Sequence, residues 1–355
     1  MIPHGGDTNS VRFLRHPEWY AVQANGLPAS YWACDFNHPG WCDYMSRVGE
    51  YWSRIGCLDG YRIDAAFGAR YENWNPAIPY ARASFSRLQG GFKMQKALRD
   101  AARRVTPDAA ILSEANTDPF ATVSDVLWDF RLGCEILHDL RTMPAREFVP
   151  KLRRWLHERT LASTPGLLFF RYSENHDLLK GIDVYGGAAS VALSALTSLI
   201  DGVPGIVDGM EATNFDDYRR IFTLRRQVCG LNNGTVDYLS PVTPDGVFAC
   251  TRHEGTNESV VVVNLNECPA AGLRPFEYAL YNNGRRVRAE VGAFAAASGE
   301  TESFSSPSTV SVSTNGFLVS TVMRIPGLKN WFASTAEGVF SSPLFKPHGS
   351  SEPAR

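Results

Sequence analysis

The sequence predicts an α/β region built from parallel βα units, followed by an all-β domain. Between about residues 41 and 210, short β-type runs alternate with helical patterns. Such alternation is typical of parallel βαβ units. After about residue 228 the pattern changes to short strands joined by turn-rich segments, which is typical of antiparallel sheets.

The elements of the α/β region follow from apolar spacing. Apolar residues at helical spacing predict helices over 45–55 and 94–105. Short apolar runs predict strands over 58–64, 109–115, 125–130, 166–172 and 203–207. Further helical patterns lie at 131–140, 148–160 and 187–200. The region therefore contains five predicted strands with helices between them.

The remainder of the chain predicts a separate all-β domain over 229–326. Strand patterns at 247–251 and 259–265 flank the turn-rich segment HEGTNE. Two more, at 310–314 and 317–325, are separated by the turn dipeptide Asn315-Gly316. The Pro- and Ser-rich residues 327–355 are expected to form a flexible tail.

Composition excludes several classes of function. The formal net charge is −2, and no basic cluster suggests binding to nucleic acid or to a membrane surface. No apolar segment is long enough to span a membrane, and MIPHGGDTNS shows no signal peptide. The seven cysteines lack metal-ligand spacing, and no G-x-G-x-x-G motif indicates a dinucleotide site. The sequence does not fix the compartment or the oligomeric state.

Three acidic residues stand at the ends of three predicted strands. Asp64 closes GYRID, Glu114 closes ILSE and Asp177 closes FRYSENHD. Because the carboxyl ends of parallel strands meet at one face, we expect these carboxylates to lie close together. Cleavage of a glycosidic bond needs two acidic groups, one that attacks the anomeric carbon and one that protonates the leaving oxygen. A pair of converging carboxylates would suit this chemistry.

Five short motifs, in order, resemble those of the α-amylase family (glycoside hydrolase family 13). GYRID resembles the strand-four motif, in which an Arg precedes the nucleophilic Asp by two positions. ILSEA resembles the strand-five motif, and SENHD resembles the strand-seven motif. DFNHPGWCDYM resembles the lead-in to the helix before strand four, and GVPGIVDGME resembles the strand-eight segment. One such motif is a weak signal, but five in order across residues 35–211 are specific.

The resemblance implies a role for each matched residue. Asp64 would be the nucleophile that forms a covalent glycosyl-enzyme, and Arg62 would hold it ionised and oriented. Glu114 would be the general acid/base, protonated before the first step and activating water in the second. His176 and Asp177 would bind sugar hydroxyls, with Asp177 as the third carboxylate of the site.

Weaker candidates lie in three loops. MIPHGG resembles the end of the strand-three motif, which makes His4 a candidate for contact with the sugar in the innermost subsite; an ordinary loop histidine is the alternative. Trp74 follows strand four, where acceptor-side contacts form in the family, although loop aromatics often simply pack. Trp128 and Asp129 lie near the end of the predicted strand 125–130. For them too, contact with the sugar and simple packing are both open.

The resemblance implies a (β/α)8 TIM-type barrel over residues 1–228 that lacks its first three βα units, followed by an all-β C-terminal domain. Only five strands are predicted, whereas a closed barrel needs eight. No cofactor is implied. Ala65, Ala66 and Phe67 follow Asp64 and have no side-chain oxygen, so we expect no calcium at the usual family site and no other metal.

The implied function is retaining hydrolysis of α-glycosidic bonds in α-glucans or α-glucosides. A transglycosylase or glucoside isomerase with the same triad remains an alternative, because only the acceptor, water or sugar, differs. An inactive carbohydrate-binding relative is a second alternative, because the predicted barrel is incomplete. The expected partner is an oligo- or polysaccharide of a length that the sequence does not fix.

Overall fold

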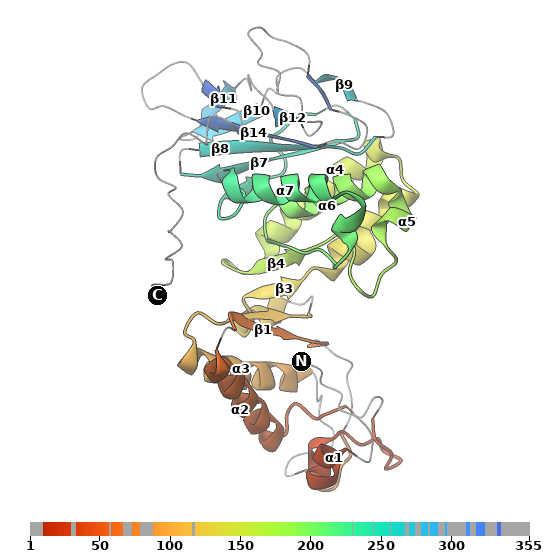
Figure 1. Ribbon diagram of the computed structural model, residues 1–355, viewed down its shortest axis with the longest axis vertical. Coiled ribbons are helices and arrows are strands. Elements are labelled where there is room, and N and C mark those ends of the chain that lie inside the picture. Colours follow the sequence, from red (N-terminus) through yellow and green to blue (C-terminus); the bar gives the residue numbers. More distant parts are fainter. Residues whose placement is uncertain are drawn as a thin grey trace, which may run out of the picture. The chain divides into compact units, whose positions relative to one another are not determined.

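The computed structural model describes most of the chain up to residue 266 and short strand segments beyond it (Figure 1). The described residues are 10–29, 33–56, 58–66, 73–78, 88–115, 118–228, 230–243, 245–255, 257–266, 270–273, 278–282, 285–289, 295–296, 310–312, 317–323 and 332–334. The chain divides into two compact units. The first comprises residues 1–131 and 162–171, and the second comprises residues 132–161 and 172–355.

A parallel sheet and two long helices dominate the first unit. Its elements are α1 Val11–Arg15, η1 Pro17–Trp19, α2 Pro39–Ile55, β1 Gly60–Ile63, α3 Leu88–Val105, β2 Ala110–Ser113, η3 Asp118–Thr122, β3 Val126–Trp128 and β4 Leu168–Arg171. Parallel registers pair Ile63 with Ser113, Ser113 with Leu127 and Leu127 with Phe169. The parallel sheet has the order β1-β2-β3-β4-β5, and its last strand, β5 Val203–Pro204, is a segment of the second unit. The predicted parallel βα pattern is confirmed.

Helix α2 is confirmed. Of the apolar residues whose spacing predicts it, only Met45 lies on its buried face. The His38 side chain caps its first turn by accepting from the Gly40 N–H at 3.1 Å. The side of α2 that is buried repeats every four residues and consists of Trp41, Met45, Gly49 and Ser53. A Cβ at Gly49 would lie 2.8 Å from the Leu98 carbonyl oxygen, so this glycine permits the close approach of α3. The apolar residues at helical spacing here are Met45, Val48, Trp52 and Ile55, and of these Trp52 and Ile55 are 50% and 56% exposed.

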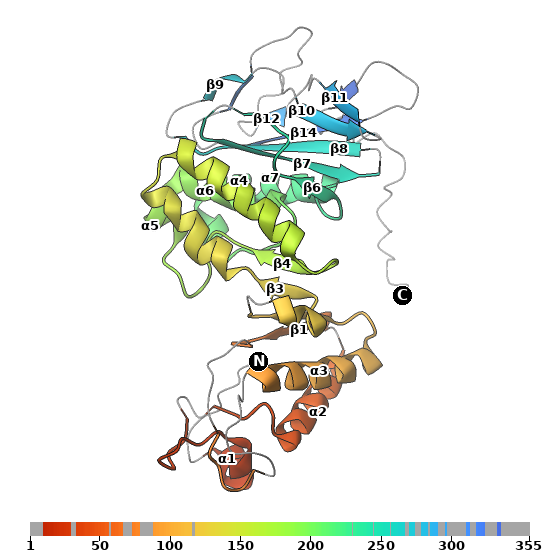
Figure 2. The same cartoon turned by 180° about the vertical axis from the view of Figure 1, so that it is seen from behind.

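One face of the sheet packs against α2 and α3, which lie on the same side of β1 in Figures 1 and 2. Ile63 of β1, Leu127 of β3 and Phe169 of β4 belong to one apolar cluster with residues of these helices. The Ser113 hydroxyl donates to Gln95 of α3, which places this residue on the same face. Because successive side chains of a strand point to opposite faces, the residues one position later in the sequence point away from the helices.

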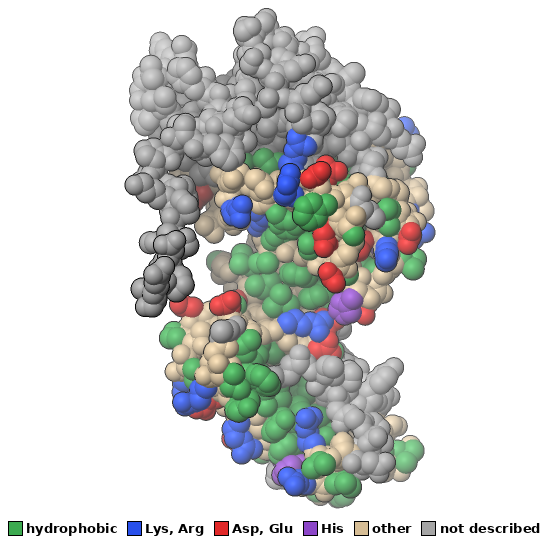
Figure 3. Space-filling view, viewed as in Figure 1, with side chains coloured by type: hydrophobic (Ala, Val, Ile, Leu, Met, Phe, Trp, Pro, Cys, Tyr) green, Lys and Arg blue, Asp and Glu red, His purple; other side chains and the backbone are tan. Residues whose placement is uncertain are grey.

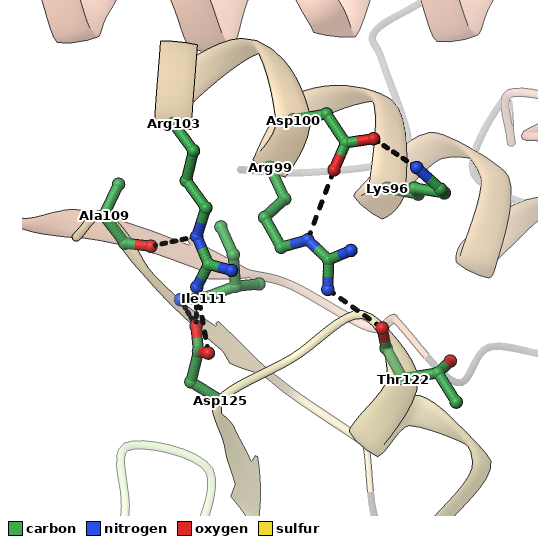
Figure 4. A network of polar contacts seen from close by, with 8 residues as sticks. All are labelled: Lys96, Arg99, Asp100, Arg103, Ala109, Ile111, Thr122 and Asp125. Atoms are coloured by element: carbon green, nitrogen blue, oxygen red, sulfur yellow. Dashed lines mark hydrogen bonds and ion pairs between the residues drawn. The ribbon is translucent and has the colours of Figure 1, made fainter. Parts of the chain in front are cut away.

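Arg103 joins the C-terminal end of α3 to the sheet (Figure 4). Its guanidinium contacts the two carboxylate oxygens of Asp125 at 2.9 and 2.8 Å, and its Nε donates to the Ala109 carbonyl at 3.0 Å. Asp125 also accepts from the Ile111 N–H at 2.7 Å. We expect Arg103→Met to lower the free energy of unfolding by about 1 kcal/mol, since one nitrogen, Nη2, contacts both carboxylate oxygens but the pair is partly exposed. Urea unfolding tests this, with the exposed Arg104→Met as control; equal midpoints for the two variants would contradict the assigned role.

Helices and an antiparallel sheet form the second unit. Its helical elements after the π-helical turn η4 Arg131–Ile136 are η5 Leu137–Arg141, α4 Ala145–Ala162, α5 Gly181–Tyr185, α6 Gly187–Leu199, η6 Met210–Thr213 and α7 Phe215–Gln227. Its strands are β6 Thr235–Asp237, β7 Val247–Glu254, β8 Asn257–Asn264, β9 Ala270–Leu273, β10 Tyr278–Asn282, β11 Arg285–Ala289, β12 Ala295–Ala296, β13 Val310–Val312, β14 Phe317–Met323 and β15 Phe332–Ser334. Buried residues of α4, α6 and α7 share one apolar core with β7 and β8, which both ribbon views show beside these helices (Figure 2).

The antiparallel pairing agrees with the predicted hairpin and adds a second one. Strands β7 and β8 pair from Val247 with Asn264 to Glu254 with Asn257, across the predicted HEGTNE turn. The strands flanking Asn315-Gly316 have different partners, because β13 pairs with β9 and β14 pairs with β8, β12 and β15. The hairpin of β10 and β11, which the sequence analysis did not predict, pairs Asn282 with Arg285 next to its turn.

The surface of the described residues carries both signs of charge. On the face drawn in Figure 3, acidic and basic side chains are interspersed over the residues that are coloured. Among the described residues, no helix is both long and apolar enough to cross a bilayer.

Candidate active site

The sheet register brings Asp64 and Glu114 to neighbouring positions. Each is the first residue after its strand, and β1 and β2 pair in parallel with Ile63 opposite Ser113. The Glu114 N–H donates to the Ile63 carbonyl at 2.9 Å, which extends the ladder by one step. Two of the three carboxylates predicted from the sequence therefore leave the same edge of the sheet side by side.

Arg62 contacts both carboxylates. Its Nη1 donates to Asp64 Oδ1, and its Nη2 lies 2.8 Å from Glu114 Oε2. Arg62 precedes Asp64 by two positions, so the strand's alternation directs both side chains to the same face, away from α2 and α3. The side chains of Arg62, Asp64 and Glu114 are 30%, 24% and 12% exposed, so the cluster is largely but not wholly shielded from water.

The backbone after Asp64 adds a third contact to Glu114. Ala65 has a φ of 43°, and it is the only non-glycine residue with positive φ that the described part of the chain contains. This left-handed conformation is disfavoured for alanine by roughly 1–3 kcal/mol. It accompanies a hydrogen bond in which the Ala65 N–H donates to Glu114 Oε2 at 2.6 Å. A strained turn thus helps to fix the position of the Glu114 carboxyl group.

The electrostatic environment favours a proton on Glu114. Burial raises the pKa of Glu114 above its ordinary value, and the neighbouring charge and hydrogen bond of Asp64 raise it further. The Ala65 N–H and the Arg62 guanidinium act in the opposite direction, but the net change of the pKa is upward. Two carboxylates that share one cation carry a surplus negative charge, and holding one of them protonated relieves it. An upward shift of this pKa is what the general acid of such a pair requires.

Trp128 contacts the cluster in a way that the sequence analysis did not predict. It is the last residue of β3 and pairs in register with Phe170. The guanidinium carbon of Arg62 lies over its ring at 5.1 Å from the centroid. Trp128 is only 7% exposed, so it is not an open platform for a sugar ring. The signal in the sequence is its place near the end of the predicted strand 125–130, because Asp64 and Glu114 also stand at the ends of their predicted strands.

Asp129, the second ambiguous residue of this strand, forms a buried ion pair. Its carboxylate accepts from Arg171 Nη1, and the two side chains are 3% and 0% exposed. Arg171 is the last residue of β4, and its guanidinium also lies 4.9 Å from the Phe169 ring centroid. The charge of Asp129 is therefore matched by its own arginine, which assigns this pair to the structure of the sheet.

His176 and Asp177 belong to the second unit. Asp177 follows β4 by six residues, and its N–H donates to the Asn175 side-chain oxygen at 2.9 Å. His176 Nε2 lies 3.6 Å from Asp177 Oδ2, and both side chains are more than half exposed. Next to them the buried Glu174 accepts from the Gly181 N–H. The two predicted sugar-binding groups are thus neighbours on a loop that a buried carboxylate anchors.

The two weaker candidates differ in what the structure describes of them. Trp74 is 36% exposed, and its backbone N–H donates to the Val22 carbonyl at 2.7 Å. The preceding Asn73 is buried and donates to Asp35 at 2.6 Å, so the loop that carries Trp74 is tied to the segment before α2. His4 lies outside the described residues. In the described part of the chain, His, Cys, Asp and Glu side chains form no group of three that could hold a metal ion.

Comparison with solved structures finds this fold in several enzymes. The chain aligns with an α-amylase from H. orenii at a TM-score of 0.63 and 14% identity, over 90% of this chain and 76% of that one. It aligns with the noncanonic maltogenic α-amylase AmyB from Thermotoga neapolitana at a TM-score of 0.62 and 16% identity, over 92% of this chain and 77% of that one. It aligns with the acarbose-soaked debranching enzyme of Nostoc punctiforme at a TM-score of 0.60 and 16% identity, over 86% of this chain and 69% of that one. No model of a known protein family matches the chain, and no curated protein does.

The comparisons confirm the predicted fold class. The structural neighbours are (β/α)8-barrel enzymes of the α-amylase type with a C-terminal β domain. This chain has a five-stranded parallel sheet followed by a separate antiparallel sheet, as expected of part of such a barrel and its β domain. The resemblance inferred from the motifs is thus confirmed at the level of the fold.

Proposed function

We propose that this chain belongs to the α-amylase family and cleaves α-glycosidic bonds of α-glucans or α-glucosides with retention of anomeric configuration. The observation that carries the proposal is the contact of one guanidinium, that of Arg62, with the carboxyl groups of both Asp64 and Glu114. Retaining glycosidases need two such groups, roughly 5–5.5 Å apart, on either side of the scissile bond. The fold that the chain shares with amylases supports the same reaction class.

In the first step Asp64 is the nucleophile and Glu114 is the acid. An Asp64 oxygen forms a bond to the anomeric carbon while the bond from that carbon to the leaving oxygen breaks. The proton of Glu114 moves to the leaving oxygen, so the aglycone departs as a neutral alcohol. Burial raises the pKa of Glu114, which favours this proton, and the Arg62 contact fixes the orientation of the Asp64 side chain.

In the second step the roles of the same groups reverse. Glu114, now a carboxylate, accepts a proton from water, and the water oxygen bonds to the anomeric carbon as the ester to Asp64 breaks. The sugar leaves with its original configuration because it has been inverted twice. His176 and Asp177 are proposed to bind sugar hydroxyls, with Asp177 stabilising positive charge on the ring. Trp74 is proposed to contact the acceptor-side sugar.

Activity should depend on pH through Glu114. Because burial raises the pKa of Glu114 above its ordinary 4.5, the alkaline limb of kcat should lie above that value. Activity is lost as pH rises through this limb, because the acid loses its proton. With an α-glycosyl fluoride, whose leaving group needs no protonation, the limb should move or vanish. An identical alkaline limb for an oligosaccharide and the fluoride would contradict the role of Glu114.

The product anomer tests the reaction class. The chain should be incubated with maltooligosaccharides, and the first product followed by proton NMR before mutarotation. Initial release of the α-anomer is the expected result, and initial release of the β-anomer, or no cleavage, would contradict the proposal. Products longer than the substrate would identify sugar, rather than water, as the preferred acceptor and would favour the transglycosylase alternative. An isomerised glucoside would favour the isomerase.

A further inference from the structure

Trp128 lies beneath the guanidinium that links the two acids. The parallel registers place Ser113 opposite Leu127 and Leu127 opposite Phe169, so the next residues along, Glu114 and Trp128, share one level of the sheet. Their side chains point away from α2 and α3, as that of Arg62 does. The guanidinium carbon of Arg62 then lies 5.1 Å from the centre of the indole.

The contacts of Arg62 are of two different kinds. A guanidinium donates hydrogen bonds from its edges and is attracted to aromatic rings through its face. Here Nη1 donates to Asp64, Nη2 forms an ion pair with Glu114, and the guanidinium carbon lies over the Trp128 ring. Hydrogen bonds alone leave a long side chain free to tilt, whereas an aromatic surface restricts the plane of the cation.

The indole is itself held in place by its neighbours. Its ring centroid is 4.6 Å from that of Phe170 and 6.1 Å from that of Phe130, and only 7% of the residue is exposed. Close packing restricts the orientation of a buried ring, and the ring in turn restricts the orientation of a cation that lies against it. Trp128 is thus a fixed surface rather than a mobile cleft residue.

We propose that Trp128 is a positioning residue: its indole face holds the Arg62 guanidinium in the orientation that joins Asp64 to Glu114. The inference deepens the proposed function, since it assigns a residue to the support of the two acids. Without the ring, Arg62 would tilt away from one or both carboxylates, and the nucleophile would lose its fixed direction.

Loss of the ring should change the protonation of Glu114 in a defined direction. In the described part of the chain, the groups that act on this carboxyl are Arg62, Asp64 and the Ala65 N–H. Arg62 lowers the pKa of Glu114, whereas burial and Asp64 raise it. If the guanidinium moves away, the lowering contribution weakens and the pKa of Glu114 rises further. The alkaline limb of activity should then shift to higher pH.

Two substitutions at Trp128 test the proposal. Trp128→Leu removes the aromatic face and keeps an apolar side chain, while Trp128→Phe keeps a smaller face. We expect Trp128→Leu to lower kcat roughly tenfold, which is the rate equivalent of a cation–π contact between the exposed and the desolvated limits, with KM changed by less than about threefold. Its alkaline limb should move up, and Trp128→Phe should fall between Leu and the wild type.

A matched control separates positioning from packing. Phe120 is a fully buried aromatic of the same unit whose ring centroid lies 4.4 Å from that of Phe92. Phe120→Leu should destabilise the chain comparably while leaving kcat and its pH profile unchanged. If Phe120→Leu shifts the pH profile as Trp128→Leu does, the effect is one of general packing and the inference fails. Should Trp128→Leu not fold, Trp128→Phe carries the comparison.

A spectroscopic readout makes the test independent of turnover. The Glu114 carboxyl carbon can be titrated by NMR with labelled glutamate, its resonance assigned by its absence in Glu114→Gln. An upward shift of its pKa in Trp128→Leu supports the positioning role even if the wild type cleaves no glucan, which would overturn only the proposed function. An active wild type with an unchanged Glu114 titration in Trp128→Leu would overturn the inference alone.

Discussion

Asp64→Asn should lower kcat on maltooligosaccharides by about four to six orders of magnitude, the scale on which enzymes with a covalent intermediate lose activity when the nucleophile is removed. An amide cannot form the glycosyl ester, and no acceptor or leaving group compensates for that. The variant should fold normally, because Asp64 is 24% exposed and the Arg62 guanidinium keeps its contact with Glu114. Steady-state kinetics with an oligosaccharide and with a glycosyl fluoride should show the same loss.

Glu114→Gln provides the matched contrast. Loss of a general acid lowers the rate by about 10²- to 10⁴-fold. The loss should be large for an oligosaccharide, whose leaving oxygen must be protonated, and small for the first step with a glycosyl fluoride. The two variants thus separate nucleophile from acid. If the fluoride restores the first step in Asp64→Asn rather than in Glu114→Gln, the two roles have been assigned to the wrong residues.

Arg171→Met should lower the free energy of unfolding by about 3–5 kcal/mol, because it leaves the Asp129 carboxylate buried without its cation. Both side chains are almost wholly inaccessible to water, at 0% and 3% exposed. The double variant Arg171→Met with Asp129→Leu should recover most of the loss, since an apolar pair of similar volume needs no desolvation of charge.

Urea unfolding followed by tryptophan fluorescence measures this effect. The control is Arg47→Met, which removes an exposed ion pair with Asp43, both side chains being about two-thirds exposed. Such pairs contribute at most about 1 kcal/mol. A double variant that is no more stable than Arg171→Met alone would contradict the assignment of the pair as a buried charge couple.

The sheet edge that carries Asp64 and Glu114 could be predicted from the sequence because it depends on local patterns. Strand β1 ends where GYRID changes from apolar to acidic, and β2 ends likewise at ILSE. Parallel strands of this kind carry their functional residues just past their carboxyl ends, so Asp64 and Glu114 could be expected to meet. The contact of Arg62 with Asp64 was expected from the family resemblance, and the two-residue period of the strand accounts for it, whereas the contact with Glu114 was not predicted.

Other parts of the site depend on contacts that local patterns do not contain. Trp128 contacts Arg62 only because the register of two further strand pairs fixes its level, and a single sequence does not give a register. The left-handed Ala65 is likewise invisible in sequence, because alanine rarely adopts positive φ. The buried face of α2 differed from the apolar spacing because Gly49 brings α3 close.

The most direct test of the central claim is to map the covalent intermediate. Glu114→Gln, supplied with an α-maltosyl fluoride, should accumulate the glycosyl-enzyme, because its second step lacks the base that activates water. Peptic digestion and mass spectrometry should then place one maltosyl ester on Asp64, and Asp64→Asn in the same background should carry none. A maltosyl ester on a different carboxylate, or turnover of the fluoride with inverted product and no ester, would contradict the account.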